Sequence, residues 1–173
     1  MRLGVDEVGV TELMAVTEHA RAMSTTAAGL LLERLDDEGG LVAALADEAG
    51  AEPVRALLAE VRAVVPPAMG RRDVPALWRI LARNPHYLRS TWRKEQVVMR
   101  EGALAAGDKR RTALGVAMAV RGRYMIEYHT AILRHGGDTD RDILEVLGVV
   151  DHYTTLNTLS EGMQIESDIR PPA

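Results

Sequence analysis

Apolar residues recur three or four positions apart along almost the whole chain of 173 residues, and no useful length of it alternates with a period of two. This spacing is typical of helices that bury one face, so the pattern predicts an all-α protein. The predicted helices span residues 11–35, 41–49, 53–65, 75–83, 84–101, 109–134 and 139–164.

Prolines set several of these limits. Pro53 suits the first turn of a helix, and Pro66-Pro67 ends the helix that it begins. Asn84-Pro85 separates the next two helices, because a residue before proline is disfavoured in the α region, and Asn84 is a good cap for the second of them.

The segment 109–134 shows no comparable break and is predicted as one long central helix. Asp108 is a suitable N-cap for it, and Gly136-Gly137 would close it. At 1.5 Å per residue such a helix crosses the whole domain, so one side of it should be buried along its length. Asp138 or Thr139 would cap the last helix.

Charge divides the chain into two unequal parts. Residues 1–77 hold seven Arg against thirteen Asp plus Glu, a net charge of −6, whereas the remainder carries +2. We expect residues 1–70 to form an N-terminal helical region packed on the core, and residues 71–173 to form a helical core. All six Trp and Tyr residues lie in the second part.

Composition excludes several classes of function. Cysteine is absent, which removes disulfides, thiolate nucleophiles and cysteine-bound metals. No segment is apolar for long enough to span a membrane, and no signal peptide is evident, so we expect a cytoplasmic protein without a membrane partner. A pI near 5.7 argues against nucleic acid as a partner, despite the arginines between Arg79 and Arg123.

The segment 121–137, RGRYMIEYHTAILRHGG, carries the densest set of chemical side chains. His129 lies on its apolar face, where a histidine is either a satisfied core residue or a functional imidazole. Tyr124, Glu127 and Tyr128 form a neighbouring stripe, although Glu127 is also placed to pair with Arg123. Buried phenols need hydrogen-bond partners and therefore tend to line polar cavities.

The residue patterns for phosphate binding, nucleophilic catalysis by serine and metal binding are absent from the sequence. No glycine-rich phosphate loop and no nucleophile elbow is present, and no pair of histidines has metal-ligand spacing with a carboxylate on the same face. We therefore expect no metal and no cofactor, and any catalysis should be of the acid–base kind.

The sequence from Trp78 to Met163 resembles the superfamily of carboxymuconolactone decarboxylases and alkylhydroperoxidase-D-like proteins. The resemblance rests on the order of three features: a helix containing His129-Thr-Ala, a helix start at Asp140-Arg-Asp-Ile-Leu, and Tyr153 followed by Asn157. It implies an alkylhydroperoxidase-D-like helical bundle that assembles as a homo-oligomer, a trimer or hexamer. Residues 1–70 lie outside the resemblance.

The peroxidases of this superfamily place a Cys-x-x-Cys pair seven and four residues before the histidine, where this chain has Gly122 and Met125. Their upstream proton-relay glutamate falls near Arg110, a second departure. The resemblance therefore excludes dithiol peroxidase chemistry and favours the precedent of the decarboxylases, which act on a small carboxylated lactone without cysteine.

Two functions follow from this resemblance. One is an acid–base enzyme of small-molecule metabolism that performs decarboxylation, isomerisation or lactone chemistry; the other is a non-catalytic ligand-binding or scaffold protein with the same fold. For the enzyme, the expected catalytic residues are His129, Tyr128, Tyr124 and Glu127. The expected substrate-binding residues are Arg121, Arg123, Tyr153, Asn157 and Trp92.

Overall fold

The computed structural model describes residues 4–46, 49–65 and 74–165, and the regular elements in these ranges are α-helices, as the sequence predicts. In chain order they are α1 (Glu7–Gly29), α2 (Glu52–Val64), α3 (Ala76–Leu81), α4 (Pro85–Met99), α5 (Ala106–Ala119), α6 (Arg123–His135) and α7 (Asp140–Gly162).

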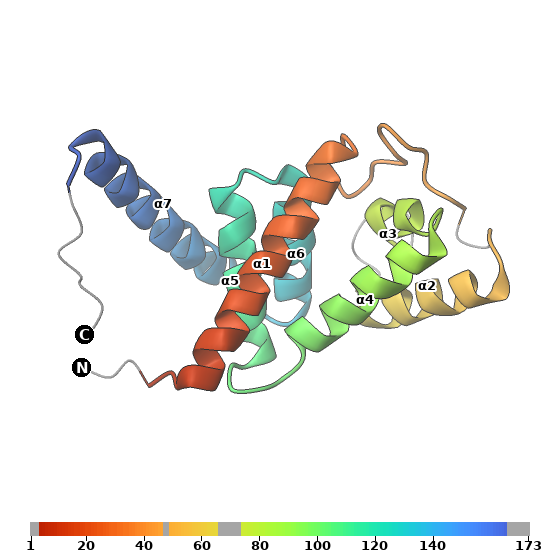
Figure 1. Cartoon of the computed structure of the whole chain (residues 1–173), viewed down its shortest axis with the longest axis horizontal. Coiled ribbons are helices and arrows are strands. Elements are labelled where there is room, and N and C mark those ends of the chain that lie inside the picture. The colour runs from red at the N-terminus through yellow and green to blue at the C-terminus, as the bar shows by residue number, and fades with distance from the viewer. Residues whose placement is uncertain (1–3, 47–48, 66–73, 166–173) are drawn as a thin grey trace.

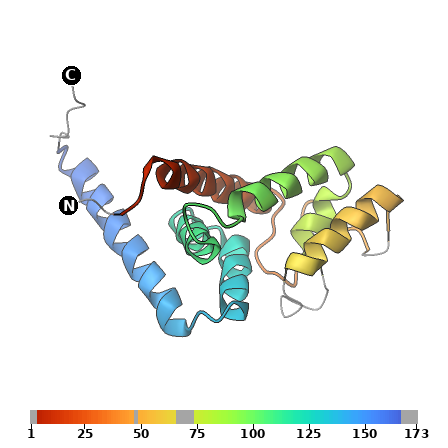
Figure 2. The same cartoon turned by 90° about the horizontal axis from the view of Figure 1, so that it is seen from below.

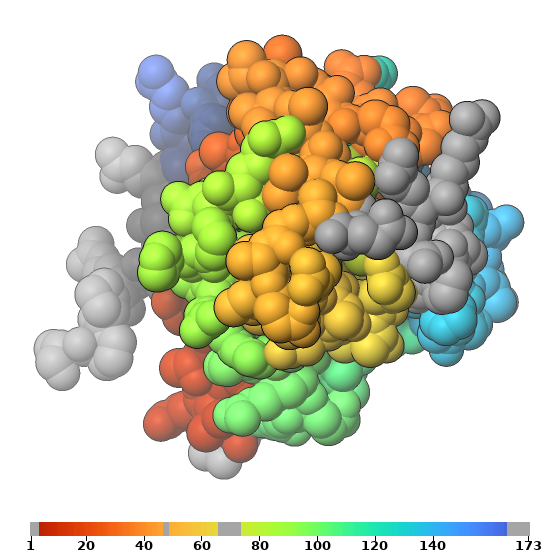
Figure 3. Space-filling view, turned by 90° about the vertical axis from the view of Figure 1, so that its right-hand side faces the viewer, coloured from red at the N-terminus to blue at the C-terminus, as the bar shows by residue number. Residues whose placement is uncertain are grey.

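The helices pack around α5, which lies between α1, α6 and α7 (Figure 1). α4 continues this group through contacts with α1 and α5, and α2 and α3 pack against α4 at one end of the molecule. In the view from below, α7 extends along the opposite end, away from α2 (Figure 2). Figure 3 shows the first of these ends, where α2 lies beside α4.

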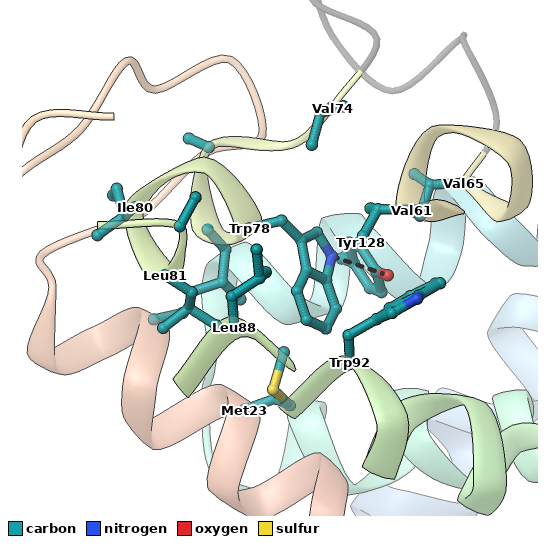
Figure 4. Close-up of a cluster of buried hydrophobic side chains, with 14 of the residues drawn as sticks. Met23, Val61, Val65, Val74, Trp78, Ile80, Leu81, Leu88, Trp92 and Tyr128 are labelled. Atoms are coloured by element: carbon teal, nitrogen blue, oxygen red, sulfur yellow. Dashed lines mark hydrogen bonds between the residues drawn. The ribbon is translucent and has the colours of Figure 1, made fainter. Parts of the chain in front are cut away.

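The main hydrophobic core lies at the end formed by α2, α3 and α4, and α1 and α6 also contribute side chains to it. The rings of Trp78 and Trp92 meet edge to face at its centre, with centroids 5.2 Å apart and planes at 83°. Figure 4 shows Met23, Val61 and Tyr128 converging on this pair from three other helices. A smaller cluster joins α1, α4 and α5 through Val16, Ala20, Met99 and Ala113.

Local signals placed several helix ends correctly. Pro53 lies in the first turn of α2, and the Asn84 side chain caps α4 by accepting a hydrogen bond from the Tyr87 N–H at 3.1 Å. Thr139 caps α7 in a capping box with Asp142. Pro66-Pro67 and Asp73 lie outside the described residues, whereas Asp108, predicted as an N-cap, lies in the first turn of α5 instead.

The prediction of one continuous helix over 109–134 is wrong, because the chain turns between α5 and α6. Arg121 adopts a left-handed conformation with φ of 57°, and its N–H donates to the Met118 carbonyl at 3.0 Å. The Gly122 N–H donates to the Ala117 carbonyl at 2.8 Å. These two bonds form a Schellman motif, which ends α5 with an arginine where glycine is usual.

The prediction for residues 11–49 is also wrong in part, since α1 ends at Gly29 and residues 41–46 are not helical. Buried Arg79 accounts for the second difference: its guanidinium donates to the carbonyls of Val74 and Leu45, both at 3.0 Å. The Arg83 guanidinium donates likewise to the Ala43 carbonyl at 2.6 Å. The carbonyls of this segment thus bind arginine side chains from the α3 region instead of helical N–H groups.

Candidate active site

Four polar side chains from four helices form a continuous hydrogen-bonded chain inside the molecule: His19 of α1, Glu95 of α4, Arg110 of α5 and His129 of α6. Their exposed fractions are 2%, 4%, 8% and 1%. Nε2 of His19 lies 2.7 Å from Oε2 of Glu95, and Nη2 of Arg110 donates to Oε1 of Glu95 at 2.9 Å. Nη1 of Arg110 lies 3.2 Å from Nδ1 of His129. We call this set the buried polar chain.

The carboxylate of Glu95 is the centre of the buried polar chain. Burial opposes its ionisation, but the charge of Arg110 and the hydrogen bond from His19 outweigh that effect and lower the pKa of Glu95 to about 2. Glu95 is therefore an anion at neutral pH, held between a guanidinium and an imidazole. A buried charge of this kind is tolerated only when it is paired and hydrogen-bonded.

The contact with Arg110 fixes the tautomer of His129. A guanidinium has only donors, so Nδ1 of His129 must accept, and the proton of the neutral ring lies on Nε2. Burial, assisted by the charge of Arg110, lowers the pKa of His129 to about 3, which keeps the ring neutral at physiological pH. Its Nε2–H is buried and has no hydrogen-bond partner among the described residues.

The two tyrosines of α6 are buried in the main hydrophobic core, next to the buried polar chain. The Tyr124 hydroxyl accepts from the Leu77 N–H at 3.1 Å, and the Tyr128 hydroxyl accepts from Nε1 of Trp78 at 3.4 Å (Figure 4). Burial raises the pKa of both phenols, so each stays protonated. The ring of Tyr128 meets His129 edge to face at 5.3 Å between centroids.

Glu127 does not join the buried polar chain. Its Oε2 accepts from the Leu35 N–H at 3.1 Å, and its Oε1 lies 4.0 Å from the Arg34 guanidinium. The predicted partner, Arg123, instead pairs with Glu33 at 3.0 Å on the surface. Glu127 thus ties α6 to the loop that follows α1.

The start of α6 holds Gly122 and Met125, the positions at which the resemblance implies the Cys-x-x-Cys pair of the peroxidases. Met125 is 1% exposed and belongs to the main core. Gly122 faces α1 so closely that an added Cβ would lie 2.8 Å from Cβ of Ser24 and 2.9 Å from its Oγ. Arg121 and Arg123 are exposed at this same end of α6.

A groove of about 500 Å³ opens beside the buried polar chain, between α4, α5 and the C-terminal half of α6. Glu95 and Arg110 form part of its wall, and Trp92 lines it with its Nε1–H bound to Glu60 at 3.0 Å. The remaining lining residues are Val64, Gln96, Met99, Arg100, Ala106, Gly107, Arg111, Ile132, Leu133, Gly136 and Asp138. We call it the α4–α6 groove.

Tyr153 and Asn157 lie in a different place. They line a hollow of about 480 Å³ between α5 and α7, together with Thr112, Gly115 and Val150. Of the predicted site residues, the structure therefore brings Trp92 to the α4–α6 groove and His129 to the residues behind it. It places Arg121 and Arg123 at the opposite end of α6 from the groove.

Three members of the buried polar chain were not predicted from the sequence. His19, Glu95 and Arg110 are far apart in sequence, and each lies on a helix whose polar residues are mostly exposed. Arg110 was noticed only as a departure from the superfamily's proton-relay glutamate. In the structure, a carboxylate is present after all, supplied by Glu95 from α4 and bound to Arg110.

The described ranges contain neither a metal site nor a membrane-spanning helix. No group of three or more His, Asp or Glu side chains there is arranged to hold a metal ion. Nor does the described chain contain a helix with the length and apolarity needed to cross a membrane.

Comparisons with known proteins show the family to which this helical fold belongs. Residues 85–165, which span α4 to α7, match the model of the carboxymuconolactone decarboxylase family. The crystal structure of the alkylhydroperoxidase AhpD core from Rhodospirillum rubrum is similar, with 33% sequence identity and a TM-score of 0.60 over 67% of this chain and 83% of that one. No curated protein matches. The chain therefore belongs to the carboxymuconolactone decarboxylase and alkylhydroperoxidase-D-like superfamily, as a member without the Cys-x-x-Cys pair.

Proposed function

We propose that the α4–α6 groove binds a small carboxylated metabolite and performs acid–base chemistry on it without cysteine, such as decarboxylation, isomerisation or a lactone reaction. The observation that carries this proposal is the buried polar chain at the groove wall. Ionised groups are costly to keep inside a protein, and they concentrate where charge develops during a reaction.

The groove has the parts that such a ligand needs. Arg100 lines it, is exposed, and its guanidinium has no ion pair with another described residue, so it is free to bind a carboxylate. Exposed Val64 and half-buried Ile132 supply apolar surface for the body of the ligand, backed by buried Trp92 and Leu133. This combination of apolar walls and few polar groups is usual for small-molecule sites.

The geometry suggests how roles divide within the buried polar chain. Glu95 and Arg110 line the groove and would face the reacting atoms, the first as an anion and the second as a stabiliser of developing negative charge. His129 lies behind Arg110 and holds its guanidinium through Nδ1. His129 would then act as a positioning residue, and Tyr128, whose ring meets it edge to face, would brace it.

The proposal is tested with a panel of small carboxylates followed by NMR, with benzoate as the first probe. Binding should shift the resonances of groove residues, and the variant Arg100→Gln should weaken it about tenfold, as expected for loss of one ion pair. Arg141→Gln on α7 is the matched control. Equal weakening by the two variants, or no binding to the groove, would contradict the proposal.

A second function, ligand binding without catalysis, is favoured by the state of His129. Its ring is almost completely enclosed and its pKa of about 3 makes it a poor base at neutral pH. Incubation with a bound carboxylate separates the two functions. An enzyme converts the ligand and loses this ability in Glu95→Gln, whereas a binding protein returns the ligand unchanged.

We also propose that the protein forms a homo-oligomer in which α7 contacts a second copy. None of the residues of α7 is buried. Leu144, Leu156 and Leu159 are 63%, 43% and 53% exposed, a large apolar surface for one helix. Covering it with the same helix or a neighbouring face of another copy would remove this surface from water.

A further inference from the structure

His19 connects the buried polar chain to a second opening. Its side chain lines a hollow of about 240 Å³ between α1 and α4, where Thr26, Tyr87, Thr91 and Lys94 are among its neighbours. No described residue lines both this hollow and the α4–α6 groove. Glu95, the hydrogen-bond partner of His19, lines the groove, so one hydrogen bond separates the two openings.

The hydrogen bond fixes the tautomer of His19. The ionised carboxylate of Glu95 can only accept, so Nε2 of His19 carries the proton that it donates. The hydrogen bond uses Nε2 alone, which leaves the other ring nitrogen, Nδ1, outside the pairing with Glu95. An imidazole in this arrangement can take up a proton at Nδ1 while it gives one up from Nε2.

The other members of the buried polar chain cannot exchange protons in this way. Arg110 does not lose its proton in proteins. His129 has Nδ1 occupied by Arg110 and Nε2 enclosed without a partner. A groove that performs acid–base chemistry therefore has His19 as its connection to water on the side of α1.

We infer that His19 is the proton-exchange residue of the α4–α6 groove, passing protons between water in the α1–α4 hollow and the carboxylate of Glu95. The role in catalysis rests on the proposed function of the groove. In the forward direction, a proton binds Nδ1 of His19, and the proton on Nε2 moves to Oε2 of Glu95. The neutral carboxyl group can then protonate a bound ligand. The reverse sequence removes a proton from the ligand and restores the starting tautomer.

Charged groups around His19 come from each helix that packs on it. Glu18 on α1 pairs with Lys94 on α4 near the hollow, so their charges largely cancel there. Arg110 on α5 and neutral His129 on α6 lie on the inner side. The positive charge of Arg110 lowers the pKa of Glu95, so the neutral carboxyl is a short-lived state that passes its proton on.

NMR of the whole protein labelled with ¹⁵N tests this inference without a substrate. The readouts are the tautomer of His19 and the rate at which its Nε2–H exchanges with water. Ala22→Phe and Thr91→Leu narrow the hollow at two of its lining positions, and Gly107→Phe narrows the groove. Ala22 is exposed, and a Cβ at Gly107 would meet only Arg111 at 3.7 Å, so both phenylalanines have room.

We expect the Nε2–H tautomer, and an exchange rate that falls about tenfold or more in the two hollow variants and stays unchanged in Gly107→Phe. The Nδ1–H tautomer, slower exchange in Gly107→Phe alone, or equal rates in all proteins would overturn the inference. Benzoate titration of the same samples reports separately on the groove. If benzoate fails to bind while the hollow variants slow exchange, the proton route stands and the proposed function fails.

Discussion

The buried polar chain and α7 reverse the usual distribution of side chains in opposite ways. In the first, an anion, a cation and two imidazoles lie almost fully enclosed among four helices. In the second, leucines and valines lie exposed along a helix of 23 residues. The charged groups of the polar chain are paired within one molecule by hydrogen bonds, whereas much of the apolar surface of α7 stays exposed, although Val146 and Val150 lie against α5. The proposed role of the buried polar chain therefore depends on pairing within one molecule, and the proposed role of α7 depends on a second copy.

The largest effect on stability should come from breaking the buried polar chain at its centre. Glu95→Ala leaves Arg110 as an uncompensated buried cation and removes the acceptor of His19. We expect the free energy of unfolding to fall by about 3–5 kcal/mol, as for other buried pairs that lose one partner. Urea denaturation measures it. Glu95→Gln keeps the shape and should cost less; a loss below about 1 kcal/mol for Glu95→Ala would show that the pairing contributes little.

A second test uses pH. The pKa of His129 is about 3 in the folded protein and about 6.5 in an unfolded chain. As the pH falls below about 6.5, the unfolded chain therefore binds a proton at this histidine that the folded protein does not bind. The contribution of His129 to the free energy of unfolding is fully present above the pKa of the unfolded chain. It is lost as the pH falls toward the pKa of the folded protein. Between about pH 8 and pH 5.5 this residue should account for a loss of ~1.4 kcal/mol.

The variant His129→Gln isolates that contribution, because an amide oxygen can still accept from Arg110 but does not titrate. Denaturation curves of the two proteins at both pH values give the comparison. A wild-type protein with the same pH dependence as His129→Gln would show that His129 is accessible to protons in the folded state.

Changes on α7 should affect assembly more than folding. In the double variant Leu156→Glu and Leu159→Glu, the new charges oppose burial against a second copy, so native mass spectrometry should show dissociation to monomers. The free energy of unfolding of the monomer should change by no more than about 1 kcal/mol. Val97→Glu on α4, which is 59% exposed, is the control. An unchanged mass for the α7 variant would place the assembly surface elsewhere.

The smallest effect should come from an exposed ion pair of α7. Arg141 and Glu145 lie one turn apart at 3.2 Å, with side chains 87% and 65% exposed. Arg141→Ala should cost about 0.5 kcal/mol or less, since solvent screens such pairs. Denaturation at low and high salt measures it, and a cost comparable to that of Glu95→Ala would remove the contrast between the two regions.

Sequence predicted most of the fold because the relevant signals are local. The caps at Asn84 and Thr139 and the first-turn Pro53 act within a few residues, and each was confirmed. The turn between α5 and α6 was missed because the periodicity continues through it and the left-handed position is occupied by Arg121 instead of glycine. The prediction of a helix over 41–46 is wrong for another reason. Arg79 and Arg83 bind carbonyl groups of this segment although they lie far from it in the sequence, and no local pattern reveals such contacts.

The candidate site was predicted less well because it is assembled from four helices. His129 was identified from the superfamily's pattern, but its partner Arg110 lies 19 residues earlier and Glu95 lies 15 residues before that. His19 belongs to the region that the resemblance does not cover. An isolated sequence contains no signal for such pairs, since each residue alone resembles an ordinary polar residue of a helix surface.

The close approach of α1 to Gly122 has a consequence for attempts to engineer a dithiol into this chain. A cysteine at Gly122 would place its Cβ within 3 Å of Ser24, so α1 would have to move or Ser24 would have to become glycine first. At Met125, a cysteine would leave a void in the main core. Each substitution is thus destabilising by itself, and a working pair would need compensating changes in α1 and in the core.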